Sequence, residues 1–488
     1  MNLRSILVLG VGRVLQLAIV FVTFRFLTTL LPVKEVGFFF LLQSLSGFVI
    51  LAGISPVGSF VAREINNWRL GGHLNDGLFG FAGLTLAIAL LAAIGFGFIH
   101  FSGLTSWSNY ASLPLFMGAL FVSIAGAAMA NTYIPLFNIL GFSQLFVLIS
   151  VGTQLVAFAA SVGVASYLTN YADAVSWISA TGTIQLAFGF VAYKILSTRE
   201  SKQASVEAPA ISRAHRVRRI FSTAPAFSAP LIAANIAVWC LIQGYRPMIE
   251  SLKGLEFLAY VGLGMGLASS ISAAFEALLH QIFLPKFYRS LDDRSEVSYA
   301  HSWNDFWQNV FPVYIGFTIV LAGLSKQFVS VLANGKYANA WIYLSIGALA
   351  EFFRMAGNIV VFYTQGERKT RTTLAPYWMG AGIALAGSAY SATTNRLEGV
   401  AVSVVAGQFV ATAWMLFRVS KLSKRKISIG LPLMSALRFT LVPAVLVFAV
   451  YKLEPVWSIG IAGIVMTGLT AHYWWVRSRD MVTQQVVP

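Results

Sequence analysis

Residues 6–31 read ILVLGVGRVLQLAIVFVTFRFLTTLL, and this stretch decides the fold class. It is apolar over enough length for a helix to cross a bilayer, which takes about 20 residues. Yet it contains two charged residues, Arg13 and Arg25. A charge inside a membrane span costs about 3 kcal/mol on insertion scales, and such residues usually face a protein interior or a wet cavity. The stretch therefore predicts a membrane bundle with a polar path inside it.

The composition of the whole chain agrees with a membrane protein. Of the 488 residues, 57% are hydrophobic and only 11% are charged, whereas soluble domains contain about 25% charged residues. The net charge of +16 comes from basic residues in short loops between apolar segments. Membrane orientation explains that pattern better than nucleic acid does, so we expect no nucleic-acid partner. The lone cysteine, Cys240, excludes an intrachain disulfide and a multi-cysteine metal site.

Apolar runs of spanning length recur along the chain and predict about fourteen transmembrane helices. The expected spans are 6–31, 36–62, 77–100, 111–135, 144–168, 173–197, 221–245, 256–284, 304–324, 338–364, 373–392, 397–417, 432–451 and 456–476. The runs are continuous and do not alternate between apolar and polar residues over about ten positions, as outer-membrane strands do. We therefore expect an all-α polytopic membrane protein.

The distribution of Lys and Arg predicts the orientation. With a cytoplasmic N-terminus, 23 of the 34 basic residues fall in inside segments, seven in outside segments and four within spans. This asymmetry follows the positive-inside rule. It supports an even number of spans and cytoplasmic termini at both ends, as in a multi-pass protein of the bacterial inner membrane.

The predicted orientation can be tested by cysteine labelling. A cysteine introduced at Asn109 should react with a membrane-impermeant reagent in intact cells, because that position falls in an outside loop. A cysteine at Ser205 falls in an inside loop and should be protected. The reverse labelling pattern would contradict the orientation.

A weak internal repeat suggests how the spans are grouped. The spacing Arg25-x9-Glu35 at the end of the first span recurs as Arg246-x9-Glu256 at the end of the seventh. Transporters are often built from such repeats. We expect a six-helix lobe over 1–198, a basic cytoplasmic linker over 199–220 and a second six-helix lobe over 221–418. The remaining residues, 419–488, should form two additional helices and a cytoplasmic tail.

Polar residues spaced three or four apart share one helix face, and several spans carry such stripes. The first span carries Arg13, Gln16 and Thr23, and the seventh carries Asn235, Trp239, Gln243 and Arg246. We expect cavity residues that bind substrate and a smaller group that couples transport to an ion. The substrate-binding candidates are Arg13, Gln16, Arg25, Asn235, Gln243, Arg246, Arg354 and Asn358, and the ion-coupling candidates are Glu276, His280 and Glu351.

These candidates have simpler explanations. Glu351 and Arg354 fit a structural ion pair, Glu276 and His280 lie near enough to a span end to reach water, and Arg25 and Arg246 can extend their charged ends to the interface. Arg13 is the hardest to explain in this way, because it lies deep in its span without an acidic neighbour. Its planar guanidinium suits phosphate oxygens.

No catalytic constellation is visible in the sequence. The chain has no HExxH, P-loop or GxSxG motif, and its short outside loops leave no room for a catalytic domain. Gly262, Gly264 and Gly266 lie in the middle of a span and favour close helix packing over nucleotide binding. We expect no enzyme activity, no cofactor, no catalytic residue and no metal site.

Particular stretches resemble the polysaccharide transporters of the multidrug/oligosaccharidyl-lipid/polysaccharide exporter superfamily, especially the O-antigen and exopolysaccharide flippases of the Wzx type. These stretches are Gly12-Arg13, the segment from Arg25 to Phe40, the segment from Gly58 to Glu64, and Leu284-Pro285-Lys286-Phe287. Span count, linker position and the orientation of the ends also fit. The two spans beyond twelve depart from many relatives, while lipid II flippases have fourteen.

The resemblance implies two six-helix lobes around a central cavity that opens alternately to each side. The implied cargo is an undecaprenyl-diphosphate-linked oligosaccharide for lipopolysaccharide O-antigen or exopolysaccharide biosynthesis. Its diphosphate would pair with arginines, while its lipid tail stays among membrane lipids. Other polysaccharide-assembly proteins are possible partners. A cation-coupled drug exporter of the same superfamily, an O-antigen polymerase or ligase, and a lipid II flippase are the alternatives.

Overall fold

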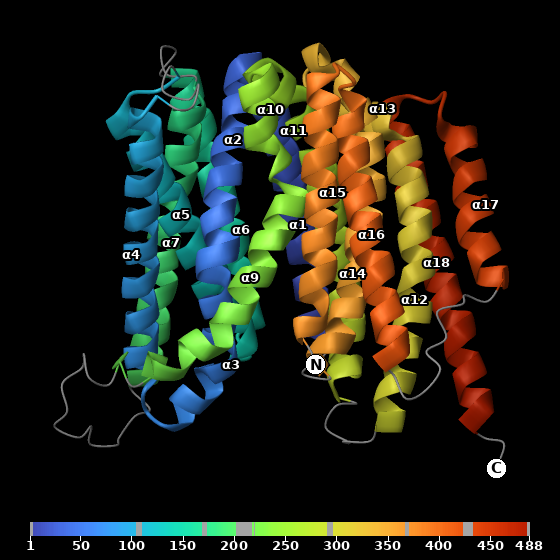
Figure 1. Cartoon of the computed structure of the whole chain (residues 1–488). Coiled ribbons are helices and arrows are strands. Elements are labelled where there is room, and N and C mark those ends of the chain that lie inside the picture. Colours follow the sequence, from blue (N-terminus) through green and yellow to red (C-terminus); the bar gives the residue numbers. More distant parts are fainter. Residues whose placement is uncertain are drawn as a thin grey trace. The chain divides into compact units, whose positions relative to one another are not determined.

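A computed structural model describes residues 3–103, 110–167, 173–201, 217–218, 220–289, 296–366, 370–422 and 433–485. The described elements are all helical (Figure 1). The longer helices are α1 (Leu3–Leu30), α2 (Val33–Phe48), α3 (Ser55–Leu70), α4 (Leu74–Phe101), α5 (Leu113–Ile139), α6 (Ser143–Tyr167), α7 (Ala174–Ser201), α9 (Ala224–Ile242), α11 (Leu255–Arg289), α12 (Glu296–Gly323), α14 (Trp341–Gly366), α15 (Leu374–Thr393), α16 (Glu398–Leu422), α17 (Leu433–Val450) and α18 (Pro455–Gln485). The short elements are η1 (Val49–Ile54), η4 (Phe221–Thr223), α10 (Tyr245–Lys253), α13 (Ser325–Leu332), η5 (Gly335–Ala340) and η6 (Thr370–Thr373).

The helices confirm the all-α membrane fold. Each of the fourteen predicted spans coincides with a helix of the described chain. Twelve helical stretches in these residues are long and apolar enough to cross a membrane, and α15 and α17 fall outside that set. The number fourteen is therefore approximate. Helices suit a bilayer because they satisfy every main-chain polar group internally, and the chain is a multi-pass membrane protein.

The second predicted span differs from a plain α-helix. The segment Val33–Leu70 is one continuous helical stretch in which η1, residues Val49–Ile54, forms a π-helical turn. A π-turn inserts one residue into an α-helix and is often found at functional sites. The seventh predicted span also differs, because α9 ends at Ile242 and the separate short helix α10 follows at Tyr245.

The chain forms two compact units, Met1–Ala259 and Tyr260–Pro488, and the boundary falls within α11. In the first unit, α5 packs along α7, α7 along α6, and α6 along α1. The α5–α7 contact is close because Gly126 and Gly182 bring the two main chains together. Such small residues are common where membrane helices approach closely.

The first unit also contains α9, which packs on α3 and η1. These contacts place residues 224–259 in the same compact unit as residues of the expected first lobe. The sequence-based division at the basic linker, residues 199–220, rests on the internal repeat and stays a prediction. Most of that linker lies outside the described residues, as do Asn109 and Ser205.

The second unit is organised around an aromatic core on α12. Trp303, Trp307 and Tyr314 are fully buried, and the indole of Trp303 donates to the main-chain oxygen of Ile359 on α14 at 3.0 Å. Helix α12 also packs against α17, and α14 and α15 pack on α16. Gly264 of α11 lies against the main chain of Ala340, as expected for a glycine that permits close helix packing.

Candidate functional site

Arg13 of α1 is a membrane-span cation without an acidic partner among the described residues. Its Nη1 donates to Oε1 of Gln16 at 3.0 Å, and its guanidinium carbon lies 5.9 Å from the ring centroid of Phe146 on α6. Its Nε is buried and has no hydrogen-bond partner in the described chain. Gly12 allows this approach because it packs directly against Val147. The two helices thus hold a half-buried guanidinium with unused hydrogen-bond donors.

The other polar residues of α1 are placed differently. Gln16 is buried and supports Arg13, whereas the hydroxyl of Thr23 donates back to the main-chain oxygen of Ile19 at 2.7 Å. Arg25 is exposed near the end of the helix. Only the Arg13–Gln16 part of the predicted stripe forms a polar cluster inside the described unit.

The stripe predicted on the seventh span exists, but it faces helix α2 and η1. The amide of Asn235 donates to the main-chain oxygen of Leu51 at 2.7 Å. The indole of Trp239 donates to the main-chain oxygen of Ser44 at 3.0 Å, and the hydroxyl of Ser44 donates to that of Gln243 at 3.2 Å. Leu51 lies in the π-turn, whose altered hydrogen-bond pattern suits an inserted side-chain donor. This row of contacts therefore ties α9 to the bent helix.

Arg246 continues the same row from α10. It is 6% exposed, and its Nη1 lies 3.2 Å from Oε1 of Gln43 and 3.4 Å from the main-chain oxygen of Phe40. Its guanidinium also lies over the Phe40 ring, with 5.4 Å to the centroid. The expectation that Arg246 reaches the interface by extending its side chain does not fit this buried position. We find Asn235, Gln243 and Arg246 engaged with α2 and η1, so their predicted role in binding substrate remains a prediction.

The second unit contains a buried charge network that joins α11 and α14. Arg354 donates through Nε to Oε2 of Glu351 at 2.6 Å and through Nη1 to Oε2 of Glu276 at 2.9 Å. The amide of Asn358 donates to Oε1 of Glu276 at 2.8 Å. The predicted pair of Glu351 and Arg354 is present, and Glu276 joins it from another helix.

His280 and Tyr314 extend this network toward α12. The Nε2 of His280 lies 3.6 Å from Oε1 of Glu276 and 3.5 Å from the hydroxyl of Tyr314. Glu276 is buried, so the prediction that it simply reaches water at the span end does not hold. Two carboxylates face one guanidinium, so the network carries one negative charge when His280 is neutral. Arg354 is neutralised by these carboxylates, which makes it a poorer anion-binding group than Arg13.

Sequence reasoning missed a pocket of about 250 Å³ between the η1–α3 segment and α5 in the first unit. Its polar lining includes Ser55, Ser59, Asn131 and Thr132. The sequence did contain a signal for it, because Pro135 lies inside an apolar helical run four residues after Asn131. Proline cannot donate the helical hydrogen bond to that residue's carbonyl group.

The fold defined by these helices is that of transporters of the multidrug/oligosaccharidyl-lipid/polysaccharide exporter (MOP) superfamily. A solved structure of the lipid II flippase MurJ in an inward closed conformation matches with a TM-score of 0.66 and 13% identity. The match covers 99% of this chain and 100% of that one.

Transporters of the MATE family share the fold over a smaller part of the chain. An outward-facing multidrug resistance MATE transporter of the MOP superfamily matches with a TM-score of 0.56 and 14% identity, over 86% of this chain and 96% of that one. A eukaryotic MATE transporter matches with a TM-score of 0.54 and 11% identity, over 90% of this chain and 96% of that one. No family model and no curated protein matches the sequence. At these identities the similarity establishes the fold, and the function must be argued from the residues.

Proposed function

We propose that this protein is a flippase for an undecaprenyl-diphosphate-linked oligosaccharide, the repeat unit of an O-antigen or exopolysaccharide. It moves this lipid from the cytoplasmic to the periplasmic leaflet of a bacterial inner membrane by alternating access. The observation that carries the proposal is Arg13, a half-buried cation in a membrane span with no acidic partner among the described residues.

The physical chemistry of the cargo explains why such a cation is needed. A glycan headgroup cannot cross hydrocarbon without leaving its polar groups unpaired. A diphosphate adds negative charge, which is costly in low dielectric unless a cation compensates it. Arginine supplies a permanent charge and a fork that bonds two phosphate oxygens at once. Arg13 has the free donors for this contact, and Gln16 fixes its position.

The network in the second unit is our candidate for ion coupling. Glu276 and Glu351 share one guanidinium, that of Arg354, and the imidazole of His280 lies next to Glu276. One proton or one monovalent cation at this network neutralises its excess negative charge. Buried carboxylates in membrane spans often serve this purpose. The substrate site and the coupling site would then lie in different compact units of the chain.

The same excess carboxylate favours a second candidate function, a cation-coupled exporter of small cationic drugs. An acidic cluster attracts a cationic substrate, whereas Arg13 repels it. A lipid II flippase is a third candidate. It belongs to the same class as the proposed oligosaccharide flippase, since its cargo is also a diphosphate-linked glycolipid. An O-antigen polymerase or ligase fits less well, because the sequence contains only short segments between its predicted outside span ends.

A translocation assay separates these candidates. The purified full chain is reconstituted into liposomes with a fluorescent undecaprenyl-diphosphate-linked oligosaccharide, and the fraction of sugar reachable by an external lectin is followed with time. Under the proposed function, proteoliposomes exchange the glycolipid between leaflets faster than protein-free liposomes. Uptake of a cationic dye such as ethidium should stay at the protein-free rate. Dye uptake without glycolipid exchange would replace the flippase by the drug exporter.

A further inference from the structure

The pocket beside the π-turn contains main-chain and side-chain polar groups without protein partners. Pro135 follows Asn131 by four residues in α5, so the Asn131 carbonyl lacks its helical donor. The Asn131 amide and the Thr132 hydroxyl have no hydrogen-bond partner among the described residues. Both residues line the pocket, so several donors and acceptors are available there at once.

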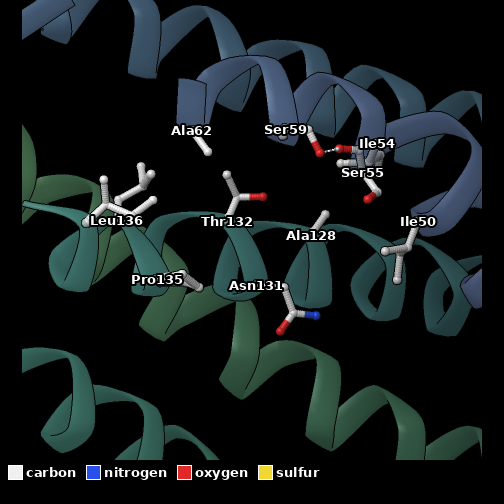
Figure 2. Close-up of a pocket in the computed structure, with 12 residues that line it drawn as sticks. Ile50, Ile54, Ser55, Ser59, Ala62, Ala128, Asn131, Thr132, Pro135 and Leu136 are labelled. Atoms are coloured by element: carbon white, nitrogen blue, oxygen red, sulfur yellow. Dashed lines mark hydrogen bonds between the residues drawn. The ribbon is translucent and has the colours of Figure 1, made fainter. Parts of the chain in front are cut away.

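The opposite wall of the pocket leaves room for a ligand. In Figure 2, Thr132 and Ala128 of α5 point toward the ribbon that carries Ser55 and Ser59. Gly58 has no side chain in this gap, and a Cβ built on it would lie 3.4 Å from the Thr132 hydroxyl oxygen. The Ser59 hydroxyl donates to the main-chain oxygen of Ser55 at 3.0 Å and keeps a free acceptor. The pocket is therefore open because small residues line it.

The position of these groups along the helices argues against contact with lipid tails. Both α5 and the segment Val33–Leu70 are long and apolar enough to cross a membrane, and the polar pocket residues lie about two turns or more from the ends of these helical stretches. An unpaired amide or carbonyl in hydrocarbon costs several kcal/mol, and irregular backbone at such depth is tolerated where it lines a wet cavity or is buried in protein. The exposed Asn131 and Ser59 therefore indicate a face that meets water or a polar ligand.

The lining also restricts the chemistry of that ligand. No ionisable side chain lines the pocket, which disfavours a phosphate group or a metal ion. Hydroxyls, an amide and a main-chain carbonyl alternate with apolar surface from Ile54 and Pro135. A sugar ring has matching properties, because it presents several hydroxyl groups around apolar C–H faces.

From this geometry we infer that the pocket of η1, α3 and α5 is a saccharide subsite, which holds a neutral sugar of the cargo. The inference rests on the proposed function, because it assigns part of the same headgroup. It adds residues that neither charge nor sequence spacing indicated. The Thr132 and Ser59 side chains bond sugar hydroxyls, while the anionic part of the headgroup is left to Arg13.

The test compares two lipids on the purified full chain in detergent. One is bare undecaprenyl diphosphate, and the other is the same carrier with a single N-acetylhexosamine. Their dissociation constants are measured by native mass spectrometry. Wild type should bind the glycosylated carrier roughly tenfold more tightly, as expected for one to two additional net hydrogen bonds. Equal affinity for the two lipids would overturn the inference.

Two substitutions locate the preference in the pocket. Thr132→Val removes one hydroxyl at constant shape and should reduce the preference roughly threefold to fivefold. Ser59→Leu fills the pocket and should abolish the preference, while the affinity for the bare carrier stays unchanged. The matched control is Ser197→Leu on α7, where the serine hydroxyl also bonds its own helix, at 3.0 Å to the main-chain oxygen of Lys194. That variant should retain the full preference.

The outcomes separate this inference from the proposed function. If Ser59→Leu lowers the affinity for both lipids equally, the pocket holds the carrier tail or supports the fold, and the saccharide subsite is wrong. Arg13→Ala should lower the affinity for both lipids by the same factor and leave the preference for the glycosylated carrier intact. If Arg13→Ala leaves the bare-carrier affinity unchanged while the pocket variants lose the preference, the anion site fails and the saccharide subsite stands.

Discussion

Arg13→Ala is expected to reduce glycolipid translocation strongly while the amount of protein in the membrane stays unchanged. The substitution removes a cation that has no acidic partner in the described chain, so no carboxylate is left unpaired. A bidentate bond between arginine and phosphate is charge-assisted and contributes about 1.5–3 kcal/mol. Its loss predicts a translocation rate lower by roughly 10-fold to 100-fold. The reconstituted lectin assay measures this rate.

Two further variants test the chemical role of this residue. Arg13→Lys should restore part of the rate, because lysine keeps the charge but loses the fork. Arg63→Ala is the matched control on another helix of the same unit, since Arg63 is exposed and lies 3.8 Å from Glu64. It should translocate at the normal rate. Normal translocation by Arg13→Ala would disprove the assignment of Arg13 as the anion site.

Glu276→Ala should destabilise the protein clearly. Glu276 is 6% exposed and accepts hydrogen bonds from Arg354 and Asn358. Removing this carboxylate leaves the donors of Arg354 and Asn358 without their acceptor, which costs about 1–3 kcal/mol for each unsatisfied buried group, while Glu351 still pairs with Arg354. Thermal unfolding of the purified protein in detergent should show a clear decrease in Tm. Glu64→Ala, at an exposed pair, should cost less than about 1 kcal/mol.

A triple variant separates stability from coupling in this network. Replacing Glu276, Glu351 and Arg354 by leucine removes all three charges together, and buried triads often tolerate apolar replacement without loss of stability. The triple variant should therefore recover most of the Tm lost in Glu276→Ala, while ion-driven translocation stays absent. Full ion-driven translocation by the folded triple variant would rule out a coupling role for this network.

The all-α membrane fold was predictable from sequence because its signals are local. Each span is a continuous apolar run, and the pair Glu351 and Arg354 lies three residues apart on one helix. The connection from Arg354 to Glu276 spans 78 positions and depends on how α11 packs against α14. No spacing rule within one helix contains that information.

The polar face of α9 shows a different limit of sequence reasoning. The periodicity of Asn235, Trp239 and Gln243 correctly placed them on one side of the helix, but it could not tell which surface they face. In the structure, Asn235 and Trp239 donate to main-chain oxygens of η1 and α2, and the main-chain oxygen of Gln243 accepts from the Ser44 hydroxyl. The π-turn itself, residues Val49–Ile54, contains no proline and no polar residue that would predict it from sequence. The position of its freed main-chain groups is a property of tertiary packing.

That single extra residue in η1 sets the angular phase between the two halves of the Val33–Leu70 helix. Each residue of an α-helix turns the chain by about 100°, so deleting one residue within Val49–Ile54 would rotate α3 by that angle relative to α2. Ser44 and Leu51 could then still meet α9, but Ser55 and Ser59 would no longer face α5. Homologous chains with one residue more or fewer at this turn would thus present a different surface to the ligand in the pocket. A change of length at the turn could therefore change cargo preference.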